Sequence, residues 1–142
     1  MKSYVEHANI VVVDPEHTIH LLTAAAPDWQ VRGSGVMDNW FGKTVTWYHV
    51  GTEDTYVTIQ GGGEGEATPW TSHLTGLKHL GIVVENLDEA IQRLEEAGYS
   101  IDHFGGDHPH RKSAYYVDKH GLEFEFVEYF SERPEERNDY TL

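Results

Sequence analysis

"HANIVVVD", residues 7–14, and "HLGIVVEN", residues 79–86, are two copies of one pattern, and this pattern decides the fold. Each copy begins with histidine, continues with β-branched and aliphatic residues, and ends with a residue that can cap a helix. When the chain is shifted by 72 residues, His7 falls on His79, and later apolar positions stay in step without a gap. The chain therefore contains an internal duplication.

Each copy predicts one βαβββ unit. In the first, Asp14 is the helix cap and Pro15 takes the first helical position; in the second, Asn86 is the cap and Gly98 ends the helix. Strand-like stretches follow each helix, near residues 29–33, 44–50, 55–60, 99–104, 113–118 and 122–129. The predicted fold class is α+β: two βαβββ modules form a half-open, cup-shaped mixed sheet with the helices outside.

The predicted organisation has four parts, of which the two modules together form one domain. These parts are a first module over residues 1–60, a glycine-rich linker over 61–76, a second module over 77–130 and a polar tail over 131–142. The triple glycine of the linker is not a phosphate-binding loop, because no Gly-Lys-Ser/Thr follows it.

Strand alternation assigns the polar side chains to faces. His7 and His79 point away from the helix-facing aliphatic row of their strands, toward the space that the sheets enclose. Glu125 points the same way, whereas Glu123 is expected at an exposed sheet edge. Two neutral imidazoles and one carboxylate are a good ligand set for a divalent metal, and they leave coordination positions free for a substrate. In the strand over residues 55–60, the inward-facing side chains are those of Tyr56, Thr58 and Gln60.

These motifs resemble the vicinal oxygen chelate superfamily, which includes glyoxalase I, methylmalonyl-CoA epimerase, extradiol dioxygenases, and fosfomycin and bleomycin resistance proteins. Its modules begin with histidine before an alternating strand, and they typically end with an Asp-x-x-Gly turn and a glutamate four residues later. Here the turn and the glutamate are Asp118, Gly121 and Glu125 of "DKHGLEFEF". The likeness covers nearly the whole chain.

The resemblance implies a metal site with His7, His79 and Glu125 as ligands. The family's fourth ligand position falls on Thr58 or Gln60, depending on the register; Gln60 has an amide oxygen to offer, but neither side chain can act as a base. The remaining two-histidine, one-carboxylate set suits Fe(II) or Mn(II). The metal stays open among Fe, Mn, Zn and Ni.

Further residues fit a dioxygenase-like interpretation. His49 is a candidate acid–base group, and Tyr115 lies ten residues before Glu125, a spacing similar to that of the dioxygenase tyrosine. The dioxygenases usually have four modules, however, and this chain has two. In the loop "DHPHRK", residues 107–112, His110 and Arg111 are candidates for substrate contact, with Arg111 binding an anionic group.

Composition limits the possible partners. The 142 residues carry a net charge of −14, which disfavours nucleic acids and anionic membranes, and no apolar run is long enough to span a membrane. The chain has no cysteine, which excludes a disulfide framework and a thiolate metal site. The N-terminal residues do not read as a signal peptide, so the expected location is the cytoplasm. The expected partners are a small-molecule substrate and a second copy in a homodimer.

The leading hypothesis is a metal-dependent isomerase, lyase or O2-dependent dioxygenase that acts on a small substrate with two neighbouring oxygens. One alternative is a metal-free protein that binds or sequesters a small molecule, in the manner of bleomycin resistance. Another is an interaction protein in which the duplication serves only stability. A ligand affinity that survives treatment with a chelator would favour the second hypothesis, and a filled fold without a cavity would favour the third.

Overall fold

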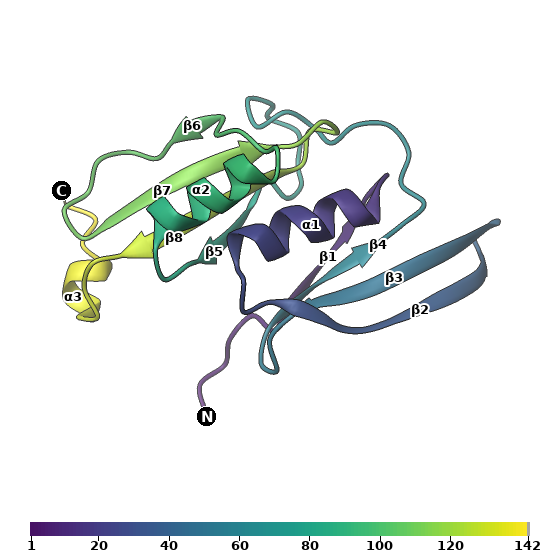
Figure 1. The fold of residues 1–142 in the computed structure, drawn as a ribbon, viewed down its shortest axis with the longest axis horizontal. Helices are drawn as coiled ribbons and strands as arrows, with labels where there is room; N and C mark the ends of the chain where they lie inside the picture. Colours follow the sequence, from purple (N-terminus) through teal and green to yellow (C-terminus); the bar gives the residue numbers. More distant parts are fainter. Residues whose placement is uncertain (142) are drawn as a thin grey trace. The chain divides into compact units, whose positions relative to one another are not determined.

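The computed structural model describes residues 1–141 and contains two compact units, Met1–Gly65 and Glu66–Leu142. Each unit has the predicted βαβββ order and one mixed four-stranded sheet (Figure 1). The α+β class and the duplication of the unit are thus confirmed.

The first unit contains β1 (His7–Val11), α1 (Pro15–Ala25), β2 (Gln30–Trp40), β3 (Lys43–Gly51) and β4 (Tyr56–Gln60). The strand order is β1-β4-β3-β2, with β1 parallel to β4 and the other pairs antiparallel. β2 is much longer than the predicted stretch, and with β3 it forms an extended hairpin that reaches past α1 (Figure 1).

The second unit contains β5 (Leu80–Val83), α2 (Leu87–Glu96), β6 (His103–Phe104), β7 (Arg111–Val117), β8 (Glu123–Tyr129) and α3 (Pro134–Arg137). The strand order β5-β8-β7-β6 repeats that of the first unit, again with one parallel pair, β5 and β8. β6 is shorter than predicted, and α3 is a short helix in the segment expected to be only a polar tail.

Both main helices begin and end as the sequence predicts. The Asp14 side chain accepts a hydrogen bond from the His17 backbone N–H at 3.3 Å, and Asn86 accepts one from Glu89 at 3.0 Å. Gly98 follows α2 with φ of +94°, a conformation that glycine adopts without strain.

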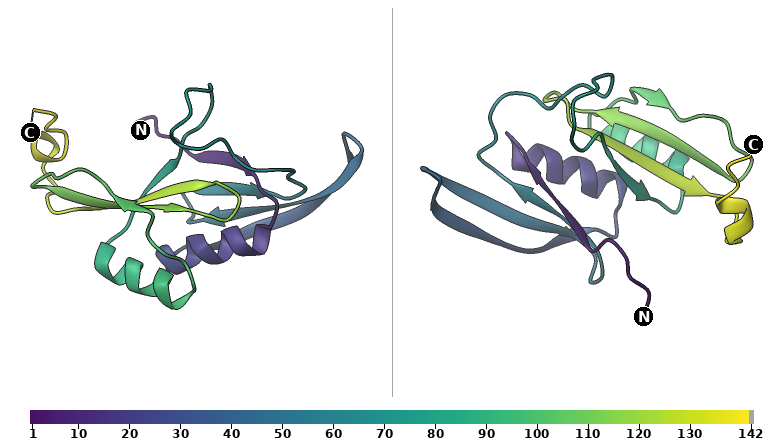
Figure 2. Two further views of the ribbon diagram at one scale, coloured as in Figure 1. Left: turned by 90° about the horizontal axis from the view of Figure 1, so that it is seen from above. Right: turned by 180° about the vertical axis from the view of Figure 1, so that it is seen from behind.

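Each helix packs on one face of the sheet of its own unit (Figure 2). The core of the first unit includes Leu21, Leu22, Val50 and Ile59, and that of the second includes Leu87, Leu94, Tyr116, Phe124 and Phe126; all are buried. Full burial of each aliphatic or phenylalanine side chain contributes roughly 1.5–3 kcal/mol. Because strand side chains alternate, the opposite face of each sheet carries the polar residues.

The predicted Asp-x-x-Gly turn joins β7 to β8. Asp118 Oδ1 accepts hydrogen bonds from the backbone N–H groups of His120 at 2.8 Å and Leu122 at 3.0 Å. Gly121 has φ of +82°, and an added Cβ would lie only 2.9 Å from the Ala67 carbonyl oxygen, so the position requires glycine. The turn fixes the point at which β8 begins, and thereby the face on which Glu125 lies.

Candidate functional site

Strand pairing in the second unit places four positions in one row across the sheet. Gly81 of β5 pairs with Glu125 of β8, Glu125 pairs with Tyr115 of β7, and Tyr115 pairs with His103 of β6. Directly paired residues point to the same face. The row therefore lies on the face opposite α2, where the sequence predicts the metal ligands.

His79, the residue before β5, contacts this row. Its Nε2 lies 3.3 Å from Glu125 Oε1, and its ring meets the Tyr115 ring edge-on, with 5.2 Å between centroids. The side chains of His79 and Glu125 are 33% and 19% exposed, so both remain accessible to a solute. Two predicted metal ligands are thus neighbours within one unit.

Tyr115 is a hydrogen-bond donor beside Glu125. Burial, the Glu125 charge and a hydrogen bond to Glu125 raise the pKa of Tyr115 from 10.0 to about 12, because each disfavours the phenolate. At neutral pH the hydroxyl therefore keeps its proton. Tyr115 therefore cannot act as a base at neutral pH, because its phenolate form is scarcely populated.

Glu123 corrects one expectation from the sequence. It is 7% exposed rather than lying on an open edge, and among residues 1–141 its Oε2 has no hydrogen-bond partner. Burial raises the pKa of Glu123, and the opposing effect of His79 and His103 is smaller. The alternation of strand side chains placed Glu123 on the correct face of the sheet, but it did not indicate how deeply the side chain is buried.

Three rings stack beside Glu123. His103 lies between Trp70, at 5.0 Å, and Tyr115, at 4.5 Å, with interplanar angles of 29° and 5°. His103 Nδ1 is 2.7 Å from Asp102 Oδ2. These rings line a cavity of about 410 Å³ that also includes His79 and Glu123.

A second cavity, of about 460 Å³, shares Tyr115, Gly105 and Gly106 with the first. Its lining includes Glu125, Tyr115, Arg111 and His108. Asp139 and Tyr140 of the C-terminal segment, residues 131–141, also line it. Among residues 1–141, no carboxylate forms an ion pair with Arg111, whereas the neighbouring Lys112 is paired with Asp88 at 2.8 Å. The arrangement leaves the Arg111 guanidinium available to an anionic group.

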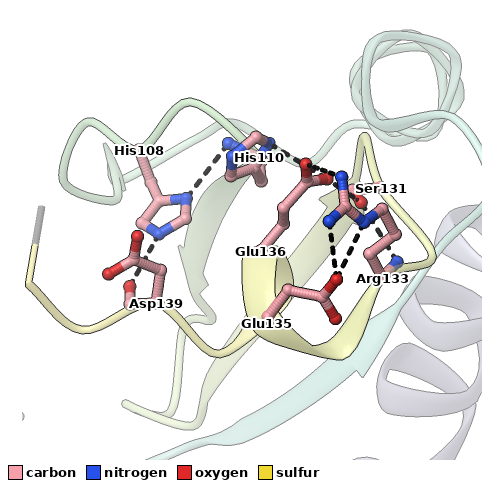
Figure 3. Close-up of polar contacts among 7 residues, drawn as sticks. All are labelled: His108, His110, Ser131, Arg133, Glu135, Glu136 and Asp139. Carbon is pink, nitrogen blue, oxygen red and sulfur yellow. Dashed lines mark hydrogen bonds and ion pairs between the residues drawn. The ribbon is translucent and has the colours of Figure 1, made fainter.

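His110 is not among the residues that line this cavity. Its Nδ1 is 3.9 Å from Glu136 Oε2, and its backbone N–H donates to His108 Nδ1 at 3.1 Å (Figure 3). The loop over residues 107–112 is therefore attached to the C-terminal segment. The sequence predicts only a polar tail for this segment, but it packs against its own unit.

The first unit carries the other predicted side chains on the corresponding face. Tyr56 is stacked between His7, at 4.8 Å, and His49, at 4.4 Å, and the Arg32 guanidinium lies 4.4 Å from the Tyr56 ring centre. Burial lowers the pKa of His49, and the nearby charges of Arg32 and His7 act in the same direction. His7 Nδ1 is 3.0 Å from Glu6 Oε1.

The register decides which residue of the first unit corresponds to Glu125. Asn9 pairs with Thr58 as Gly81 pairs with Glu125, and His49 pairs with Thr58 as Tyr115 does with Glu125. Thr58 therefore holds the equivalent position, and Gln60 lies two residues further along β4. The first unit has no carboxylate at this point.

The predicted triad is divided between the units: His7 belongs to the first, and His79 and Glu125 belong to the second. Within residues 1–141, no group of three or more His, Asp or Glu side chains is arranged to hold a metal ion. None of the helices in the described part of the chain is both long and apolar enough to cross a membrane.

Comparison with known proteins identifies the fold. Residues 6–125 match the family model described as the glyoxalase/bleomycin resistance protein/dioxygenase superfamily. A domain of that description from Frankia sp. EAN1pec is 21% identical, with a TM-score of 0.69, and the match covers 98% of this chain and 100% of that one. A glyoxalase family protein from Bacillus cereus is 14% identical, with a TM-score of 0.71 and coverage of 89% and 94%.

The fosfomycin resistance protein FosX from Listeria monocytogenes, solved as a complex with Mn(II) and sulfate, is 16% identical, with a TM-score of 0.62. That match covers 98% of this chain and 100% of that one. No curated protein matches the chain. At these identities, the solved structures establish the fold and leave the activity open.

Proposed function

Because the chain belongs to the glyoxalase/bleomycin resistance protein/dioxygenase superfamily, we propose that it is a divalent-metal-dependent enzyme that acts on a small molecule through two neighbouring oxygen atoms. The reaction is an isomerisation, a lyase reaction or an O2-dependent cleavage. The observation that carries the proposal is the contact between His79 Nε2 and Glu125 Oε1 at 3.3 Å.

The donor set fits a divalent cation. Two atoms that each lie about 2.1 Å from one cation, at right angles, are about 3 Å apart, close to the observed separation. A neutral imidazole and a carboxylate suit Fe, Mn, Zn or Ni. The third proposed ligand is His7. When bound, the cation would act as a Lewis acid on the substrate oxygens. The FosX complex with Mn(II) supports the choice of a divalent cation.

The protein side chains have distinct proposed roles. Tyr115 donates a hydrogen bond and orients Glu125, because its pKa of about 12 keeps the hydroxyl protonated. Arg111 binds an anionic part of the substrate in the cavity that it shares with Tyr115 and Glu125. His49 is the proposed acid–base group, and burial favours its neutral form. Further proposed substrate contacts are Tyr56, Thr58 and Gln60.

Elemental analysis of protein purified without a histidine tag tests the proposal. We expect about one equivalent of a divalent metal in the wild type, and its loss in His79→Ala and Glu125→Gln. His73→Ala is the matched control, because His73 is an exposed histidine of the same unit. Wild-type protein without metal, whose melting temperature also stays constant when Mn(II), Fe(II), Zn(II) or Ni(II) is added, would contradict the proposal.

A metal-free binding protein is the second candidate. It is favoured by the stacked rings of Trp70, His103 and Tyr115, which line a cavity of about 410 Å³. In this case, binding of bleomycin or another antibiotic, measured by calorimetry, would be unchanged by EDTA. Binding that disappears with the metal would exclude this candidate.

We also propose that the protein is a homodimer. Light scattering coupled to size-exclusion chromatography tests this: a mass close to that of one 16.1 kDa chain would contradict it.

A further inference from the structure

The C-terminal segment, residues 131–141, forms part of the cavity that contains Arg111. Asp139 and Tyr140 line this cavity of about 460 Å³ together with Arg111, Tyr115 and Glu125. The sequence suggested only a polar tail here. The structure instead makes two residues of the segment neighbours of the candidate site.

A histidine pair fastens the segment to the loop before β7 (Figure 3). His108 Nδ1 accepts a hydrogen bond from the His110 backbone N–H at 3.1 Å, so its hydrogen lies on Nε2, which donates to the Asp139 carbonyl oxygen at 3.0 Å. His110 Nδ1 lies 3.9 Å from Glu136 Oε2. A single imidazole thus connects the loop to the part of the segment that borders the cavity.

Among residues 1–141, the other contacts that attach the segment to its unit are few. The Arg137 guanidinium lies 4.1 Å from the Tyr129 ring centre, and the Phe130 backbone N–H donates to the His110 carbonyl oxygen at 2.8 Å. The Glu136 carboxylate of α3 binds Arg133, the residue before the helix, at 3.0 Å. α3 has no buried residue, and Tyr140 is 80% exposed. A segment held by a few polar contacts can open locally while its unit stays folded.

We propose that residues 131–141 are a clasp that forms one wall of this cavity, and that Tyr140 limits the size of the molecules that reach Arg111. In an enzyme of the kind proposed above, on which this role rests, Tyr140 is a specificity-determining residue. The physical basis is independent of the metal, because an aromatic side chain on a weakly held segment borders a cavity that Arg111 also lines.

Chemical modification of Arg111 tests the clasp without a substrate. Two arginine reagents of different size, 2,3-butanedione and phenylglyoxal, are compared by peptide mass spectrometry on the full chain. We expect Tyr140→Ala to increase the rate at which phenylglyoxal modifies Arg111 at least threefold, and the rate for butanedione less than twofold. Tyr4→Ala is the matched control, since Tyr4 is an exposed tyrosine of the first unit. Arg32 is the internal reference, because it lies in the first unit.

A second variant distinguishes the role of Tyr140 from that of the His108 hydrogen bond that holds the segment in place. His108→Ala is expected to increase the Arg111 rate for both reagents and to speed hydrogen exchange in residues 131–141, while His73→Ala changes neither. Unchanged Arg111 rates in both Tyr140→Ala and His108→Ala would overturn the proposal, as would an equal rise for the two reagents in Tyr140→Ala. The metal content of both variants should equal that of the wild type, so failure of the metal proposal is detected separately.

Discussion

The ionisation of Tyr115 reports directly on Glu125. The pKa of Tyr115 is about 12 rather than 10.0. A difference of two pH units corresponds to roughly 2.7 kcal/mol in the free energy of ionisation. Burial is the largest cause and remains when Glu125 is replaced; the Glu125 charge and hydrogen bond are the next two. Glu125→Gln removes the charge but keeps an oxygen acceptor. We therefore expect the Tyr115 pKa to fall by about one pH unit, to near 11, rather than to its ordinary value.

The assay is NMR of metal-free protein with ¹³C at the tyrosine Cζ, titrated from pH 8 to pH 11.5. Tyr115→Phe assigns the signal, and circular dichroism confirms that the protein stays folded. Tyr116 is a built-in control. Its pKa is also about 12, but burial and Glu95 are the causes, so Glu125→Gln should leave it unchanged.

Two outcomes would refute this reasoning. If Tyr115 keeps its wild-type titration in Glu125→Gln, the two side chains are not in contact, and the arrangement around Glu125 is wrong. If Tyr115 and Tyr116 shift equally, the substitution has loosened the whole sheet, because the two rings lie on opposite faces of β7.

Three further predictions concern the same unit and its counterpart. Zn(II) loading should lower the Tyr115 pKa in the same NMR titration, since a bound cation offsets the Glu125 charge; an unchanged pKa in loaded protein would count against metal binding there. Glu123 has a raised pKa, so the folded state holds its proton more tightly than the unfolded chain does, and stability falls as pH rises above the ordinary glutamate range. Glu123→Gln should therefore raise the melting temperature of metal-free protein at pH 7, with a gain that shrinks toward pH 4; a gain independent of pH would be contrary to this. In the first unit, a Cβ added at Gly35 would lie 2.6 Å from the Trp47 indole, whereas a Cβ added at Gly33 would have no atom within 4 Å. Urea unfolding should show Gly35→Ala less stable than Gly33→Ala by about 1 kcal/mol or more, and equal stabilities would contradict the close packing.

The parts of the fold that depend on local chemistry could be predicted from the sequence. Asp14 and Asn86 cap helices because their side-chain oxygens reach backbone N–H groups within the next turn. Gly121 permits a left-handed turn that other residues resist. Alternation alone placed Glu125 on the face opposite α2, whereas Tyr115 was singled out by its spacing from Glu125. Each of these inferences needs only a few consecutive residues.

Features that depend on distant contacts could not be predicted in the same way. β2 contains polar residues and glycines, such as Gly33 and Gly35, which disfavour strands; pairing with β3 nevertheless makes the strand long. Glu123 is buried and shares a cavity with rings from other segments, those of His103 and Trp70. The attachment of the C-terminal segment likewise depends on His108, a residue some 30 positions earlier.

The strand registers also show how the two copies have diverged. The equivalent row reads Asn9, Thr58, His49 and Gly33 in the first unit, and Gly81, Glu125, Tyr115 and His103 in the second. A carboxylate occurs only in the second row, beside a tyrosine that keeps its proton. Threonine at the matching position offers a hydroxyl, which is a weak ligand for a divalent cation unless it is deprotonated. The duplication therefore supplies two similar scaffolds, but the position of the first unit that matches Glu125 has no carboxylate. If the proposed metal binds, the first unit offers no carboxylate at the matching position to replace Glu125, so His79 and Glu125 are the decisive positions to test.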